Sequence, residues 1–176
     1  MEEMRSRPMI AVIGGATCTA QEAGWAEAAG RELAQRGALL VCGGRSGVME
    51  ATCRGAKAGG GLTIGLLPGT DRGAANSYVD IAIPTGLGEA RNAVIIRSAR
   101  AVIAIGGEYG TLSEIAFALK QGLPVAGLGT WQFSREDIPD DAIFRASSPE
   151  EAVDWVFGRL REQTHGRRQN HAPSAR

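Results

Sequence analysis

Short runs of apolar, β-branched residues recur along the chain and alternate with longer stretches that have helical periodicity. The runs are continuously apolar rather than alternating, which is typical of parallel strands that helices cover on both faces. They predict strands at residues 9–14, 38–42, 62–67, 79–84, 101–106 and 124–129.

The stretches between and after these strands predict helices at residues 19–36, 46–58, 88–99, 111–121 and 149–163. The clearest start is Ser148-Pro149-Glu150-Glu151, which offers an N-cap serine, a proline at the first helical position and a capping box. Strands and helices that alternate in this way predict an α/β fold: one doubly wound, mostly parallel, Rossmann-like sheet flanked by helices.

The predicted domain organisation is simple. Residues 9–163 form one Rossmann-like nucleotide- or phosphate-binding domain, between an N-terminal tail at 1–8 and a polar tail at 164–176 that we expect to be disordered. Within the domain, residues 68–78 lack periodicity and predict a loop. Residues 131–147 are irregular, with a short edge strand expected at 143–146.

Charge and composition exclude several classes of function. Lys plus Arg and Asp plus Glu both number 19, so no net field favours DNA, RNA or an anionic membrane. Both histidines, His165 and His171, lie in the polar tail, and the three cysteines show no CxxC spacing, so we expect no metal site. No apolar run approaches the ~18 residues of a membrane helix, and we expect a cytoplasmic protein without a membrane partner.

Glycine is abundant, with 25 residues, and it gathers where predicted strands end. The turns are GGATCT (14–19), GGRSG (43–47), GLGEARN (86–92) and GGEYGT (106–111). Tight turns need glycine in any case, but such turns also let backbone N–H groups and helix N-termini close on a phosphate. The candidate ligand-binding residues are Gly15, Gly43, Gly44, Arg45, Gly88, Asn92, Gly107, Glu108, Tyr109, Gly110 and Thr111.

Two standard nucleotide-binding fingerprints are absent. GxxxxGK[ST] does not occur, which excludes a P-loop kinase or ATPase. No GxGxxG opens a helix after the first predicted strand, which argues against ordinary dinucleotide binding.

The segment GGEYGTLSE (106–114) resembles the PGGxGTxxE motif of the lonely-guy phosphoribohydrolases, and Arg91 resembles the arginine of that family's second motif. LVCGGRSGVM (40–49) is similar to the family's second glycine-rich turn. A closer likeness, which includes LTIGLLPG and VDIAIPTGLGEARN, is to the molybdenum-cofactor carrier proteins and their bacterial relatives in the same superfamily. The likeness covers about residues 9–160.

The resemblance to the lonely-guy enzymes implies that Arg91 and Glu114 are catalytic and that the glycine turn holds the phosphate of a nucleoside 5′-monophosphate. The chain departs from the motif at Gly106, which replaces a proline, at Glu108, which replaces a glycine, and at Asn92, which replaces a basic residue. Glu114 has a second interpretation, because Thr111-Leu112-Ser113-Glu114 also reads as a capping box.

Three functions therefore compete. One is hydrolysis of the N-glycosidic bond of a nucleoside 5′-monophosphate to free base and ribose 5-phosphate. The second is non-catalytic carriage of molybdenum cofactor or a related pterin phosphate, and the third is a nucleotide- or nucleic-acid-sensing module, which the neutral charge disfavours for DNA. All three need no added cofactor and use a small phosphate ligand, either a nucleotide or a molybdopterin-type molecule. The relatives also imply a homo-oligomer, a dimer or tetramer, with Ile115, Ala116 and Leu119 as part of an interface.

Overall fold

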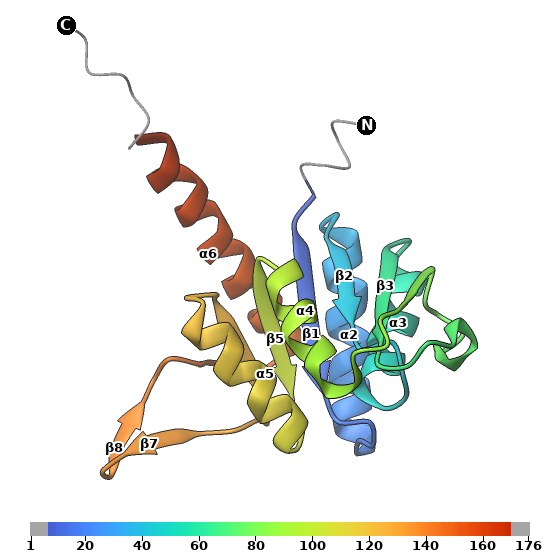
Figure 1. The fold of residues 1–176 in the computed structure, drawn as a ribbon. Helices are drawn as coiled ribbons and strands as arrows, with labels where there is room; N and C mark the ends of the chain where they lie inside the picture. The colour runs from blue at the N-terminus through green and yellow to red at the C-terminus, as the bar shows by residue number, and fades with distance from the viewer. Residues whose placement is uncertain (1–6, 170–176) are drawn as a thin grey trace, which may run out of the picture.

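The structure, a computed structural model, describes residues 7–169, without the side chains at 135, 139 and 165–169. Figure 1 shows one sheet with helices on both faces. The helices are α2 (Ala20–Gln35), α3 (Val48–Ala58), α4 (Arg91–Ser98), α5 (Tyr109–Lys120) and α6 (Pro149–Gln169), with short 3-10 turns η1 (Arg72–Ala74) and η2 (Gly88–Ala90). The main strands are β1 (Met9–Gly14), β2 (Leu39–Cys42), β3 (Leu62–Leu67), β4 (Ile81–Pro84), β5 (Ala101–Ile105), β6 (Val125–Leu128) and β9 (Phe144–Arg145).

The strand order in the sheet is β4-β3-β2-β1-β5-β6-β9, and every neighbouring pair is parallel. From β1 the chain first builds outward through β2, β3 and β4, and it then returns to place β5 on the other side of β1. The order therefore reverses between β1 and β5. In open parallel sheets of this kind, ligands bind beyond the carboxyl ends of the strands at such a reversal.

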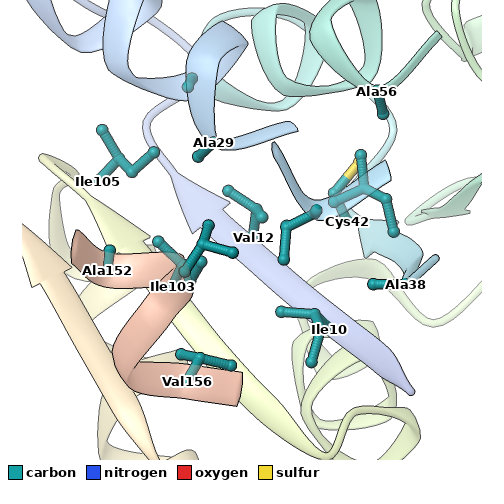
Figure 2. Close-up of a cluster of buried hydrophobic side chains, with 14 of the residues drawn as sticks. Ile10, Val12, Ala29, Ala38, Cys42, Ala56, Ile103, Ile105, Ala152 and Val156 are labelled. Atoms are coloured by element: carbon teal, nitrogen blue, oxygen red, sulfur yellow. The ribbon is translucent and has the colours of Figure 1, made fainter. Parts of the chain in front are cut away.

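Alternating side chains of the central strands enter two separate cores. Ile10 and Val12 of β1 pack with Leu33 and Val156 on the face that α2, α3 and α6 cover, and Figure 2 shows part of this cluster. On the other face, Ala11 and Ile13 pack with residues of α4 and α5 such as Ile95 and Ile115. Two-sided burial explains why these strands are continuously apolar in the sequence.

The sequence predicted the fold class and all six long strands, and the structure confirms both. The expected edge strand near residue 143 is present as β9, which pairs with β6. Between them a small antiparallel hairpin, β7 (Phe133–Arg135) and β8 (Ile138–Asp140), extends away from the sheet. The hairpin was not predicted, because neither strand has an apolar run.

Several helix boundaries differ from the prediction. Residues 88–99 divide into η2 and the short α4, because Gly88 has a positive φ of 55° and no side chain caps the start. α5 begins at Tyr109 rather than at 111, because Gly107 at φ 94° turns the chain into the helix early.

The sequence predicted a disordered tail at residues 164–176, and in the structure α6 continues into this segment as far as Gln169. In this part of the helix the Thr164 hydroxyl donates a hydrogen bond to the Leu160 carbonyl, 2.9 Å away. Residues 1–6 of the N-terminal tail and 170–176 of the C-terminal tail lie outside the described residues. In residues 7–169, no helix has the length and apolar character needed to cross a membrane.

Candidate ligand-binding site

A pocket of about 190 Å³ lies at the carboxyl end of the sheet, where the strand order reverses. The end of β1 forms one wall, and the turns after β2 and β5 and the start of α4 form the others. The pocket is lined by Val12, Ile13, Gly14, Gly15, Ala16, Gly43, Arg45, Met49, Glu89, Arg91, Asn92, Glu108, Gly110, Thr111 and Glu114.

Arg91 is the first residue of α4 and is only 8% exposed. Its guanidinium lies directly against Gly43, where a Cβ would overlap Arg91 Nη1 and also crowd Met49 Sδ. A glycine is therefore needed at position 43 for the guanidinium to occupy this place.

The Arg91 guanidinium is buried without full hydrogen-bonding partners. Within residues 7–169, Arg91 Nε is buried with no hydrogen-bond partner. Burial lowers the pKa of Arg91, while the negative charges of Glu114 and Glu89 oppose this shift. Buried donors in folded proteins are almost always paired, so an unpaired arginine donor in a pocket wall suits an acceptor that a ligand brings.

Glu114 lies inside α5 and is 7% exposed. The capping-box interpretation is wrong, because α5 begins two residues before Thr111 and its N-cap is Glu108, which makes no side-chain cap bond. In the described part of the chain the Glu114 carboxyl group has no hydrogen bond and no ion pair, although it lines the same pocket as Arg91.

Burial raises the pKa of Glu114 to about 8, with Arg91 opposing the shift and Glu89 adding to it. At neutral pH the group is therefore mostly a protonated carboxylic acid, which can donate one hydrogen bond and accept others. When Glu114 is neutral, the pocket contains two positive side chains, Arg45 and Arg91, and two negative ones, Glu89 and Glu108. These charges balance.

The start of α5 brings backbone donors to the pocket. Gly110 and Thr111 stand in the first turn of the helix, where N–H groups have no partner inside the helix. Thr111 is buried, whereas Tyr109 is 79% exposed and its ring lies 5.6 Å from that of Trp131, centroid to centroid. Trp131 Nε1 also donates a hydrogen bond to the Glu108 carbonyl at 3.3 Å, which ties the turn to the segment after β6.

The structure brings most of the predicted residues together. Arg91 and Glu114 share the pocket with Gly15, Gly43, Arg45, Asn92, Glu108, Gly110 and Thr111. Gly44, Gly88, Gly107 and Tyr109 do not line it. Gly44 has φ 72° and its Cα packs against Gly65, Gly88 opens η2, and Gly107 lines a neighbouring hollow, so these glycines shape the backbone around the pocket.

Five side chains that line the pocket were not among the predicted site residues: Val12, Ile13, Ala16, Met49 and Glu89. Glu89 lies within the glycine-rich turn 86–92, and its place two residues before Arg91 in that turn was the available signal. Met49 gave no such signal, because an apolar side chain is expected on the buried face of any amphipathic helix.

Among the side chains that the structure describes, no three or more histidine, cysteine or acidic groups gather in a cluster that could hold a metal ion. One residue expected at a subunit interface is also not available to a partner, because Ile115 is fully buried in the core of its own chain. Ala116 is exposed and Leu119 half-buried.

Known proteins with similar sequence and structure agree with this architecture. A molybdenum cofactor binding protein from Rippkaea orientalis is 37% identical, with a TM-score of 0.79 over 88% of this chain and 98% of that one. The molybdenum cofactor carrier protein of Chlamydomonas reinhardtii is 34% identical, with a TM-score of 0.74 over 88% of this chain and 99% of its own. A protein of Archaeoglobus fulgidus without a characterised function is 40% identical over 148 residues, which is 84% of this chain and 93% of that protein.

These relatives confirm the resemblance to the carrier proteins that the motifs indicated. The sequence model of the SLOG cluster4 family matches residues 7–153, which include every strand of the seven-stranded sheet and all residues that line the pocket. The chain therefore belongs to the SLOG cluster4 family.

Proposed function

We propose that this protein binds a pterin phosphate of the molybdenum-cofactor type and carries it without chemical conversion. The observation that carries the proposal is the buried Arg91 guanidinium, which lines the pocket with an unpaired Nε. A phosphate or other oxyanion would satisfy this donor together with the N–H groups at the start of α5. The similarity to two proteins described as binding or carrying molybdenum cofactor supports the choice of ligand.

The protonation state of Glu114 favours carriage over hydrolysis. Cleavage of an N-glycosidic bond passes through an oxocarbenium-like state, which an ionised carboxylate stabilises. Because the pKa of Glu114 is raised to about 8, most molecules lack that negative charge at neutral pH. A neutral carboxylic acid instead hydrogen-bonds the polar edge of a bound heterocycle without activating water.

The second candidate, hydrolysis of nucleoside 5′-monophosphates, has one specific observation in its favour. Arg91 and Glu114 lie in the same pocket as the first turn of α5, so a phosphate bound at that turn would place a sugar near the carboxyl group. This function would require Glu114 to be ionised, and its rate would therefore rise as the pH increases through about 8.

The binding proposal is tested by titration with inorganic phosphate, followed by backbone amide chemical shifts. We expect shifts at Gly110 and Thr111 at millimolar phosphate. The variant Arg91→Lys keeps the charge but loses the Nε donor, so it should weaken binding at least about tenfold, the value of a lost charge-assisted hydrogen bond. Arg97→Lys, an exposed change on the same helix, is the matched control and should bind as the wild type does. An absence of shifts in the α5 turn would overturn the proposal.

Carriage and hydrolysis are separated by incubating the protein with a panel of nucleoside 5′-monophosphates and measuring the release of free base. The carrier proposal predicts no release from any of them and tight binding of a pterin phosphate, which native mass spectrometry of the purified protein detects. Release that disappears in Glu114→Gln would instead establish the hydrolase.

A further inference from the structure

Two thiols with no part in the proposed binding function lie in contact beneath the pocket. Cys42 is the last residue of β2, Cys53 lies on α3, and their sulfur atoms are 3.5 Å apart. Both side chains are fully buried, and both are free thiols. Cys42 belongs to the core cluster between the sheet and its helices (Figure 2).

The surroundings of the pair favour a reactive sulfur at Cys42. The S–H group of Cys53 can donate to the Cys42 sulfur, and the Gly44 N–H group donates to it at 3.3 Å. The hydrogen bond from Cys53 lowers the pKa of Cys42, and Gly44 and the positive charge of Arg91 act in the same direction, against the opposing effect of burial. The same contact and burial raise the pKa of Cys53, which keeps its proton. Because the pKa of Cys42 is lowered and that of Cys53 is raised, Cys42 is the better nucleophile of the pair.

Both thiols are also close in the chain to the wall of the pocket. Gly43, which directly follows Cys42, lines the pocket and lies against the Arg91 guanidinium. Met49 lines it as well, and it stands one helical turn before Cys53 on the same side of α3. A movement of β2 therefore displaces Gly43, and a movement of α3 displaces Met49.

We propose that Cys42 and Cys53 form a reversible intramolecular disulfide that acts as a redox-sensitive modification site under the pocket. The oxidant is a small two-electron acceptor of the peroxide class. The sulfurs already lie at contact distance, so the bond requires an approach of about 1.5 Å to reach the usual S–S length of about 2.05 Å.

The chemistry balances with hydrogen peroxide as oxidant. The Cys42 thiolate attacks one peroxide oxygen, the O–O bond breaks, and the departing hydroxide takes a proton to become water, which leaves a sulfenic acid on Cys42. The Cys53 sulfur then attacks the Cys42 sulfur, the S–S bond forms, the S–O bond breaks, and the hydroxyl group leaves as water with the Cys53 proton. Two thiols are oxidised by two electrons, and one peroxide is reduced to two water molecules.

The effect on the ligand follows from close packing and rests on the proposed function. Rotation of the two side chains supplies part of this approach, and in a core at crystal-like density the rest comes from a shift of β2 and α3 toward each other. The shift reaches Gly43 and Met49, on which the place of the Arg91 guanidinium depends. Because a displacement of this order at a binding group is costly, we expect the oxidised protein to bind phosphate at least about tenfold more weakly.

The disulfide is tested by treating the protein with hydrogen peroxide, unfolding it in urea, blocking the remaining thiols with an alkylating reagent and measuring the intact mass. We expect a loss of the mass of two hydrogens, two thiols protected from alkylation, a Cys42–Cys53 cross-link in the peptide map, and full reversal by dithiothreitol. Cys18→Ser should behave as the wild type, whereas Cys53→Ser and Cys53→Ala should form no disulfide. If the Cys53 variants fail to fold, the peptide map of the oxidised wild-type protein still shows whether the disulfide forms. A cross-link through Cys18, or alkylation of both Cys42 and Cys53 after oxidation, would overturn the proposal.

The link to the pocket is tested separately with inorganic phosphate on reduced and oxidised wild-type protein. Weaker binding after oxidation that dithiothreitol restores supports the link, and equal affinity overturns it. If the reduced protein binds no phosphate, the proposed binding function is wrong. The peptide map tests the disulfide independently of that result.

Discussion

Gly43 is the residue on which the position of the Arg91 guanidinium depends, because any side chain at 43 would occupy the same space. We predict that Gly43→Ala displaces Arg91 and Met49 and weakens phosphate binding at least about tenfold, since the new Cβ overlaps the guanidinium. Isothermal titration with inorganic phosphate measures the effect. Gly24→Ala is the matched control, because nothing lies within 4 Å of a Cβ at that helical position. Equal phosphate affinity of the two variants would show that phosphate binding does not depend on the present position of the Arg91 guanidinium.

Glu114 predicts a pH dependence of stability. Its pKa is about 8 in the folded protein and 4.5 when unperturbed, so between these values the folded state keeps a proton that the unfolded state has lost. The free energy of unfolding therefore falls as the pH rises through this window, by up to about 1.4 kcal/mol per pH unit. Glu114→Gln carries no charge at any pH and should lose this decrease.

The measurement is urea unfolding of wild type and Glu114→Gln at several values between pH 5 and pH 9, read as the difference between the two proteins at each pH. Taking the difference removes the contribution of other groups, such as Asp80, whose pKa is lowered overall by the Lys57 and Thr63 contacts although burial opposes them. Glu150→Gln, an exposed change, should run parallel to the wild type. Parallel curves for Glu114→Gln as well would mean that Glu114 is ionised in the folded state.

At the scale of the element, α2 has the cap that was predicted for α5. The Thr19 hydroxyl accepts a hydrogen bond from the Glu22 N–H group at 3.2 Å, and the Glu22 carboxylate accepts one from the Thr19 N–H group at 2.7 Å. We predict that Thr19→Ala lowers the free energy of unfolding by about 1 kcal/mol, the usual effect of a lost N-cap.

Thr17→Ala is the control for the Thr19 variant. Thr17 is exposed, and its hydroxyl makes no hydrogen bond within residues 7–169, so its removal should change the free energy of unfolding little. Chemical denaturation of both variants compares them directly. Similar losses from the two changes would contradict a capping role for Thr19.

The α5 helix shows why a capping motif alone misleads. Thr-x-x-Glu fits the start of a helix, but the helix start depends on where the backbone turns, and Gly107 turns it two residues before Thr111. Glu114 is therefore inside the helix rather than at its start, and it lines the pocket without a capping hydrogen bond. The same residues then carry binding chemistry instead of a cap.

At the scale of the whole molecule, the buried face of α6 determines how much of the C-terminal segment the fold needs. Among the side chains that the structure describes, the core contacts of this helix end at Leu160, which is 6% exposed. We predict that removing residues 164–176 costs less than about 1 kcal/mol of unfolding free energy, whereas Leu160→Ala costs about 2–5 kcal/mol through the cavity that it leaves. Thermal and urea unfolding measure both, and a truncation as costly as Leu160→Ala would contradict this division.

The sequence by itself determined the fold class, because runs of apolar residues too continuous for a one-sided sheet require helices on both faces. It also determined most of the pocket, since glycine turns after parallel strands must meet at one edge of the sheet. Local periodicity did not predict the hairpin β7–β8, whose strands have no apolar run, or the end of α6, which continues through a polar segment.

Only the tertiary structure decided the chemistry of the site. The contact between Gly43 and Arg91 joins residues far apart in the chain, and it exists because α4, which leads from β4 back to β5, packs against β3, β2 and β1 on the way. The raised pKa of Glu114, the unpaired Nε of Arg91 and the contact between the Cys42 and Cys53 sulfurs all arise from burial. Burial depends on what the rest of the chain places around a residue, and no local pattern of residues contains that information.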